Sequence, residues 1–224
     1  MLVSVIVPVL DEAEQIAACL AAVLDQAGEW ELLVVDGGSR DDTRALAAAA
    51  GARVLETARG RGAQLDHGAR TARGEALLFL HADVRLPAGM HALVCATLQD
   101  PRWIAGALPV QHDASGAPLL QRAALRITAW TSRWRRLPYG DQCLFTRHST
   151  YAACGGIPHQ PLMEDVEFSQ RLRARGRIRM GPLRALASPR RFATRPVRTF
   201  LAWLAFPTLY RLGVSPERLA RWYR

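Results

Sequence analysis

Carboxylate side chains recur at three places along the chain, each at the end of an apolar stretch. Asp36 closes the first stretch, Asp83 follows the second, and the adjacent pair Glu164-Asp165 follows the third. The first two stand where buried strands are expected to end, which is where open α/β sheets bind their ligands. The third stands at the predicted start of a helix. A nucleotide, a divalent metal ion and a general base could each have a residue here.

Asp36 is a candidate ligand for a nucleotide. A carboxylate at the tip of a buried strand can accept hydrogen bonds from a base edge or a ribose. The following Gly37 and Gly38 would let a ligand approach the backbone. The alternative is that Asp36 only shapes the turn. The other two acidic positions favour the ligand.

Asp83 and His81 are candidates for a metal site beside a diphosphate. A diphosphate leaving group carries charge that must be neutralised as its bond breaks, and a divalent cation held by a strand-end carboxylate does this. His81 could bind manganese or hydrogen-bond the ribose. The alternative for Asp83 is a cap on the helix that begins near Pro87.

Glu164 and Asp165 are candidates for general-base chemistry. One carboxylate could take the proton of an acceptor hydroxyl while the other orients a neighbouring group. Acidic residues are also favoured electrostatically at a helix N-terminus, so capping alone is the alternative explanation.

Strands and helices must alternate to position these residues. Apolar runs predict strands at residues 2–10, 31–35, 53–56 and 76–80, with helices between them at 11–26, 39–50 and 63–73. This alternation indicates a parallel, doubly wound sheet. Asp11 is expected to cap the first helix in a capping box with Glu14, and Ser39 to cap the second, with Asp41 and Asp42 in its first turn.

The pattern changes after residue 80. Helices are predicted at 87–98, 119–134, 164–175 and from 215 onward, and strands at 102–111 and 142–147. The apolar segment Thr199–Leu212 is too short to span a bilayer, which needs about 20 apolar residues. Its aromatic residues beside several Arg would suit an interfacial helix on anionic lipid. A helix that closes the core or a dimer interface would show the same pattern.

Charge is distributed unevenly along the chain. Residues 1–112 carry 9 Arg and 14 acidic residues, whereas residues 113–224 carry 20 Arg and 6 acidic residues. A basic C-terminal half suits a polyanion such as lipid head groups or diphosphates, and a solvated basic face is the alternative. A nucleic acid is not the expected partner, because no recognisable nucleic-acid-binding motif accompanies the Arg residues.

The cysteines and the N-terminus indicate the compartment. The four cysteines show no CxxC spacing, so we expect buried free thiols in a reducing cytosol. The N-terminus lacks a basic leader and is typical of a first strand. Both features predict a cytoplasmic protein, with peripheral attachment to the inner membrane face as an extension of that prediction.

The glycine-rich loop Arg59–Gly62 does not match a dinucleotide-binding fingerprint, because it lacks the full GxGxxG pattern and does not open a helix directly after a strand. A P-loop is also absent from the sequence. Arg61 and Gln64 could still contact a phosphate or a sugar.

The motifs together resemble family 2 glycosyltransferases of the GT-A fold, from Val3 to about Arg175. The fold implied is α/β, with a Rossmann-like, mostly parallel central sheet flanked by helices and a C-terminal helical extension. The domain boundaries implied are 1–190 for the GT-A domain and 191–224 for an Arg-rich helical extension, packed on that domain or on a membrane surface. The pieces that carry the resemblance are Val5–Glu12, Val35–Asp41, Gly68–Gly74, Leu78–Asp83 and Glu164-Asp165.

The resemblance implies a role for each matching residue. Pro8 and Leu10 would line the base pocket through their backbone, and Glu12 and Asp36 would hold the ribose and base, most often of uridine. The donor implied is therefore a nucleotide-diphosphate sugar, with UDP as the expected nucleotide.

The catalytic residues follow from the same resemblance. Ala82 and Asp83 match the end of the DxD motif, with Asp83 on a manganese or magnesium ion, and Asp165 matches the catalytic base of an inverting displacement. His81 departs from the motif, because it replaces the first Asp. The QxxRW motif of processive synthases is missing, so transfer of one sugar is expected.

The acceptor is unknown, and a lipid-linked one is compatible with the basic tail. Asp141 and Arg191 are the candidates on the acceptor side, from their positions along the chain. Two other functions stay open. A sugar-phosphate nucleotidyltransferase is disfavoured by the acidic segment Asp11–Glu14 after the first strand. The other is a non-catalytic nucleotide- or lipid-binding module.

Overall fold

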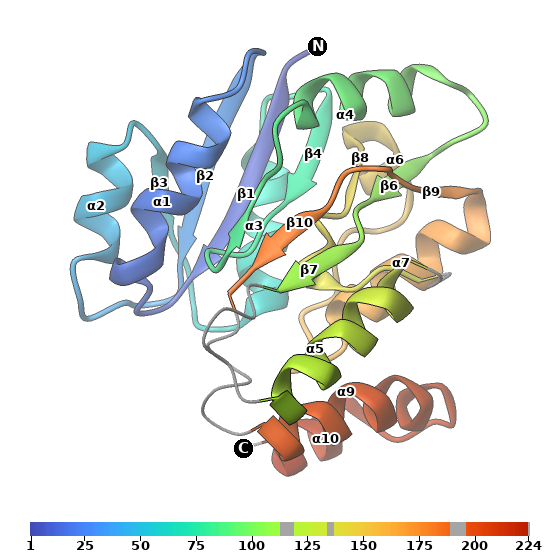
Figure 1. Cartoon of the computed structure of the whole chain (residues 1–224). Coiled ribbons are helices and arrows are strands. Elements are labelled where there is room, and N and C mark those ends of the chain that lie inside the picture. Colours follow the sequence, from blue (N-terminus) through green and yellow to red (C-terminus); the bar gives the residue numbers. More distant parts are fainter. Residues whose placement is uncertain (113–118, 134–136, 189–195, 224) are drawn as a thin grey trace.

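The computed structural model describes residues 1–112, 119–133, 137–188 and 196–223. Its centre is a seven-stranded sheet with the order β3-β2-β1-β4-β8-β6-β9, and helices cover both faces (Figure 1). This arrangement confirms the predicted mostly parallel α/β sheet.

The first 80 residues alternate as the sequence predicts. The elements are β1 (Val3–Val9), α1 (Ala13–Leu24), β2 (Trp30–Asp36), α2 (Thr43–Ala49), β3 (Arg53–Glu56), α3 (Arg61–Thr71) and β4 (Ala76–Phe79). These four strands are all parallel to their neighbours among them. The carboxyl ends of β1, β2 and β4 therefore meet at one edge of the sheet, where the predicted donor residues lie.

Both faces of this sheet are buried, which explains why its strands are apolar without alternation. Val5 and Val7 of β1 point into a core beneath α1, α2 and α4, whereas Ile6 points into a second core beneath α3, α6 and α7. Helix α3 approaches closely at Gly68, where a Cβ would lie 2.6 Å from a methyl carbon of Ile6. Glycine at this position lets α3, which carries Arg61 at its start, pack against the sheet.

The second half of the chain completes the large sheet from the other side. Its elements are α4 (Met90–Gln99), β6 (Ala105–Ala107), the 3-10 helix η1 (Gly140–Gln142), β8 (Phe145–Arg147), α6 (His148–Ala153), α7 (Glu164–Arg175) and β9 (Ile178–Met180). Strand β8 runs antiparallel to both β4 and β6, and β9 is parallel to β6.

The predicted single strand at 102–111 is wrong. The chain instead forms β6 and then β7 (Val110–His112), which belong to different sheets. Pro109 separates them and has no N–H to donate to a ladder. Strand β7 joins a small sheet with β5 (Val84–Arg85) and β10 (Ala185–Ala187), in the order β5-β10-β7. This small sheet starts immediately after Asp83.

Three further helices gather at the lower end of Figure 1: α5 (Leu119–Ser132), α9 (Pro196–Arg211) and α10 (Pro216–Tyr223). Helices α9 and α10 share a core of Ala202, Phe206 and Leu219, against which Leu162 and Met163 of the loop before α7 pack. The Tyr210 hydroxyl donates to Glu167 of α7 at 2.8 Å. Among the helices of the described residues, none has the length and apolar character needed to cross a membrane.

Candidate functional site

A cavity of about 740 Å³ lies at the carboxyl ends of β1 and β4, beside the start of α3. Its lining includes all but one of the residues predicted to contact the donor or metal: Pro8, Leu10, Glu12, Arg61, Gln64, His81, Ala82 and Asp83. Three segments far apart in the sequence supply them, because the parallel strands end at the same edge. We call this space the donor cavity.

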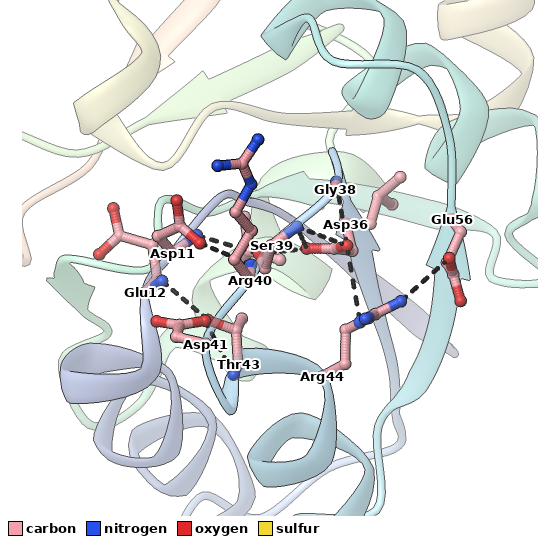
Figure 2. A network of polar contacts seen from close by, with 12 residues as sticks. Asp11, Glu12, Asp36, Gly38, Ser39, Arg40, Asp41, Thr43, Arg44 and Glu56 are labelled. Carbon is pink, nitrogen blue, oxygen red and sulfur yellow. Dashed lines mark hydrogen bonds and ion pairs between the residues drawn. The ribbon is translucent and has the colours of Figure 1, made fainter.

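Asp36 is the exception among the predicted donor residues, since it does not line the donor cavity. Its side chain is fully buried, and its carboxylate accepts hydrogen bonds from the backbone N–H groups of Gly38 and Ser39 and from the Ser39 hydroxyl (Figure 2). The guanidinium of Arg44 lies 3.9 Å away. These contacts shape the turn after β2, and contact between Asp36 and a nucleotide stays a prediction.

The predicted cap at the start of α1 is wrong. Asp11 has a positive φ of 54° and lies before the cap residue Glu12, which makes no side-chain cap bond. The Asp11 carboxylate instead accepts the Arg40 N–H at 2.8 Å. The first N–H groups of α1 are satisfied from the turn after β2, since Glu12 N–H donates to Thr43 Oγ1 and Ala13 N–H to Asp41 (Figure 2).

The predicted cap of α2 is also wrong. This helix begins at Thr43, so Asp41 precedes it and Asp42 occupies the cap position without a side-chain cap bond. The Ser39 hydroxyl is already engaged, because it donates to Asp36 and accepts the Asp11 N–H at 2.9 Å. Hydrogen bonding from Thr43 lowers the pKa of Asp41, which keeps this carboxylate charged beside α1.

Gln64 lines the donor cavity and hydrogen-bonds to the main chain of two strands. Its amide nitrogen donates to the carbonyl oxygens of Val9 and Val35, both at 2.8 Å. These are main-chain groups at the ends of β1 and β2. Gln64 therefore ties the two strands together beside the cavity, and its contact with phosphate or sugar stays a prediction.

His81 and Asp83 are the protein groups that could hold a divalent cation. Both line the donor cavity, and His81 is 7% exposed. No cluster of three or more His, Cys, Asp or Glu suited to a metal occurs among the described residues. An imidazole and a carboxylate suit manganese, and magnesium is commonly bound by one or two carboxylates together with substrate phosphates. The pair therefore fits a cation shared with a diphosphate rather than one enclosed by protein.

A second cavity of about 140 Å³ adjoins the donor cavity. The two linings share Arg61, His81 and Asp83. The second lining adds Asp141 and Asp165, together with residues of α9 and α10. We call this space the acceptor cavity, after the prediction that Asp141 lies on the acceptor side, and binding of an acceptor here stays a prediction.

Asp165 and Glu164 face different surroundings although they are adjacent. Asp165 lines the acceptor cavity, and one of its carboxylate oxygens accepts the Gly140 N–H at 2.6 Å. Glu164 lines neither cavity, is 1% exposed and forms an ion pair with Arg61. Of these two adjacent carboxylates, Asp165 is therefore the one that can meet a substrate.

The ion pair joins the starts of two helices, because Arg61 opens α3 and Glu164 opens α7. Burial lowers the pKa of Arg61, but the negative charges of Glu164 and Asp165 outweigh it and raise that pKa above its usual range. Arg61 therefore stays charged where the two cavities meet.

Asp141, predicted on the acceptor side, lines the second cavity, but the sequence does not predict the contacts of its neighbours Gly140 and Gln142. A Cβ at Gly140 would lie 2.7 Å from His81 Nε2 and 3.1 Å from Asp165 Oδ2. Gln142 is fully buried, and its amide nitrogen donates to the carbonyl oxygens of Leu108 and Ser132. Gln142 thus anchors the segment whose Gly140 N–H meets Asp165. In the sequence, the turn residues before β8 are the one local signal for this segment.

A buried polar cluster holds the loop before α7 and was also missed. The Tyr151 hydroxyl donates to Asp66 at 2.5 Å and accepts the Ile157 N–H. His159, which lines the donor cavity, lies 3.0 Å from the same carboxylate. Burial raises the pKa of Asp66, but hydrogen bonds from Arg70, Tyr151 and His159 outweigh it, so the pKa is lowered. No local pattern links residues 85 positions apart.

The remaining predictions concern Arg191 and the cysteines. Arg191 lies outside the described residues. All four cysteines are free, and Cys19, Cys143 and Cys154 are buried as predicted, whereas Cys95 is only partly buried. Burial raises the pKa of the Cys19 thiol to about 12, so it stays protonated and is unsuited to nucleophilic chemistry.

Comparison with known proteins identifies related sequences and structures. The model of the family described as glycosyl transferase family 2 matches residues 4–157. A 106-residue stretch is 35% identical to an uncharacterized protein of Mycobacterium tuberculosis. This match covers 45% of the chain but 33% of the relative, so the chain spans about a third of that relative's length.

Two solved structures share the fold. A mannosyltransferase from Pyrobaculum calidifontis, in complex with GDP-Man and Mn²⁺, superposes with a TM-score of 0.71 at 20% identity, over 99% of this chain and 67% of its own. TarS of S. aureus, in complex with UDP-GlcNAc, gives 0.69 at 17% identity, over 100% and 70%.

Proposed function

The chain belongs to glycosyl transferase family 2, and from this membership we propose that it transfers one sugar from a nucleotide-diphosphate sugar to an acceptor hydroxyl. One observation carries the proposal: the donor and acceptor cavities meet at Arg61, His81 and Asp83, and Asp165 lines the acceptor cavity. A sugar at this junction could contact groups from both cavities.

The donor proposed is a nucleoside diphosphate sugar, with UDP as the first nucleotide to test. The ends of β1 and β4 supply the lining, as an open α/β sheet does for a nucleotide. Structures of the same fold bind UDP-GlcNAc and GDP-Man, which supports a nucleotide sugar without choosing between uridine and guanosine. Arg61 adds a positive charge near the position proposed for the diphosphate.

A manganese or magnesium ion is proposed at Asp83, with His81 as a second protein ligand. When bound, such a cation would neutralise the charge that develops on the departing diphosphate. Arg61 can contribute positive charge from the protein itself, because its ion pair with Glu164 holds it at the junction.

Asp165 is proposed as the general base of an inverting displacement. Its carboxylate is fixed by the Gly140 N–H, so it needs little reorganisation to accept the proton of an acceptor hydroxyl. That oxygen would attack the anomeric carbon from the side opposite the diphosphate. Glu164 is proposed to position Asp165 through the pair with Arg61.

Residues 191–224 are proposed as an extension that contacts an anionic membrane surface from the cytoplasmic side, while residues 1–190 form the transferase domain. Exposed Arg211, Arg218 and Arg221 lie beside exposed apolar residues on this extension, which is the chemistry of an interfacial helix. Co-sedimentation with anionic vesicles should fall when these three Arg are replaced by Gln. Equal sedimentation of both proteins would remove the membrane from the proposal.

A thermal-shift panel tests the donor. The full chain is heated with UDP-, GDP- and ADP-sugars, with and without manganese or magnesium, because a ligand that binds only the folded state raises the Tm. We expect a metal-dependent shift with one class of nucleotide sugar. Asp83→Ala should lose the metal-dependent part of the shift, whereas Asp42→Asn, at the exposed cap position before α2, should keep it. The absence of any shift in a folded sample would contradict the proposed function.

A further inference from the structure

The acceptor cavity has two chemically different walls. One wall carries Asp83, Asp141 and Asp165. The wall formed by α9 consists, among its described residues, of Ala202, Phe206 and Pro207. None of these three has a side chain that can form a hydrogen bond. An occupant is therefore offered hydrocarbon by α9, while carboxylates and other polar groups, Tyr223 of α10 among them, line the rest of the cavity.

Among the described residues, the exposed side of α9 carries large apolar side chains as well as Thr208 and Arg211. Leu201 is 56% exposed and Leu204 is 68% exposed, whereas Ala202 and Phe206 are buried. A surface helix in water normally carries polar residues on its outer face. Leu212, directly after α9, is 77% exposed.

The surrounding helices share this character. Ten large hydrophobic residues are exposed in the described part of the chain, and seven lie on or next to α5, α9 and α10: Ile127, Trp130, Leu201, Leu204, Leu212, Trp222 and Tyr223. These helices occupy the same end of the molecule (Figure 1). The apolar surface is thus concentrated around the α9 wall of the acceptor cavity.

The wall favours a hydrocarbon occupant over a free sugar. A sugar placed against Ala202, Phe206 and Pro207 would bury hydroxyl groups without partners, which costs free energy. A hydrocarbon chain there would lose only contact with water, which is favourable. Exposed Arg218 and Arg221 on α10 would suit the anionic lipid surface in which such a molecule is dissolved.

We propose that the acceptor is an amphiphilic alcohol, with its hydroxyl at Asp165 and its hydrocarbon chain against Ala202, Phe206 and Pro207 of α9. This inference rests on the proposed function, because it takes Asp165 as the base. The acceptor O–H bond breaks as its proton passes to Asp165, and the oxygen forms a bond to the anomeric carbon. The bond from that carbon to the diphosphate breaks, and the nucleoside diphosphate leaves with the electron pair.

Binding of straight-chain 1-alkanols tests the apolar wall with a minimal probe. The affinity of the full chain for 1-butanol through 1-decanol is measured by calorimetry, with UDP and manganese present, beside glycerol and glucose. We expect affinity to rise about fourfold per methylene until the wall is covered, which is the gain from burying one CH₂. Glycerol and glucose should bind more weakly than the long alkanols.

Two variants localise the effect. Ala202→Phe fills the space along the wall and should remove the dependence on chain length, while nucleotide binding is kept. Ala48→Phe adds the same ring at an exposed position on α2 and serves as the matched control. Because Ala202 is packed and the larger ring could impair folding, Phe206→Leu is the milder second variant. It should weaken long-chain binding severalfold.

Each outcome bears on the proposal. It is overturned by affinity independent of chain length, by tighter binding of glucose, or by a chain-length dependence that both wall variants leave unchanged. Loss of nucleotide binding with the chain-length dependence intact would contradict the proposed function but keep the apolar site. Rising initial rates of transfer with alkyl chain length would support both together.

Discussion

The donor side and the acceptor side of the site are held together in different ways. On the donor side, short polar contacts connect neighbouring turns after β1 and β2, as in the network of Asp11, Asp36, Ser39 and Thr43 (Figure 2). On the acceptor side, long-range contacts hold α7, which carries Asp165, and the loop before it: Glu164 meets Arg61 across 103 residues, and Tyr151 meets Asp66 across 85. Regular strand ends supply the donor side, whereas separate helix starts and loops must converge to build the acceptor side.

This difference teaches where substitutions should act on chemistry and where on folding. The donor cavity depends on the parallel sheet, which many backbone hydrogen bonds and two buried faces hold together, so that no single contact is decisive. The acceptor cavity depends on a few single contacts between distant segments. We therefore expect larger effects from single substitutions on the acceptor side, and the following variants test that expectation.

Asp165→Asn should have the largest effect. The amide keeps the shape but cannot accept the acceptor proton, so transfer should slow by about 100-fold or more, the usual scale for a general base. Nucleotide binding measured by calorimetry should be unchanged, because Asp165 lines only the acceptor cavity. Near-normal turnover would show that Asp165 is not the base. It would also contradict the expectation that substitutions on the acceptor side have the larger effects.

Arg61→Met should be the most costly change to stability. It leaves the carboxylate of Glu164, 1% exposed, without its ion-pair partner, and we expect a loss of about 3 kcal/mol in the free energy of unfolding, the lower end for breaking a buried pair. Glu164→Gln should cost less, because Arg61 is 33% exposed and can be rehydrated. Urea titrations of both variants and of the double variant measure the coupling. Equal costs for the two single variants would contradict this asymmetry.

Tyr151→Phe should cost about 1.5 kcal/mol at neutral pH, the scale of a hydrogen bond to a charged group. The pKa of Asp66 is lowered in the folded protein, so its contribution is present above the ordinary value of 3.8 and is lost as the pH falls through the folded value. The difference between variant and wild type should therefore shrink on acidification from pH 6 to pH 3. A difference that grows on acidification would refute the assignment.

Thr43→Ala should have the smallest effect of the four, about 1 kcal/mol, as for a lost helix cap. It removes the acceptor of the Glu12 N–H on the donor side, where neighbouring contacts remain. Thr43→Ser keeps the hydroxyl and should restore most of the stability. Urea titrations of both variants measure this and allow comparison with Arg61→Met. A loss larger than that of Arg61→Met would reverse the comparison between the two sides.

The sequence predicted most of the donor side because its residues follow strands. The apolar runs fix where β1, β2 and β4 end, and parallel ends meet at one edge. For this reason Asp83 could be placed at that edge in advance, whereas the resemblance to the family placed Pro8 and Glu12 there. The cap predictions failed at Asp11 and Ser39, because the turns bond to each other rather than each to its own helix.

The acceptor side could be predicted only in part. The sequence shows the acidic pair at the start of α7, but not its division into a buried Glu164 and a cavity-lining Asp165. That division depends on Arg61 and Gly140, which arrive from other elements. The splitting of 102–111 into two sheets likewise follows from partners, β9 and β10, that come much later in the chain.

By itself the sequence determined the parallel sheet, because local apolar patterns dictate strands and helices. Its motifs identified the family and the candidate carboxylates. Only the tertiary structure decided which carboxylate meets the acceptor cavity and that α9 forms its apolar wall. Contacts between residues many positions apart depend on how elements pack, and the pattern of a single element carries no information on its partner.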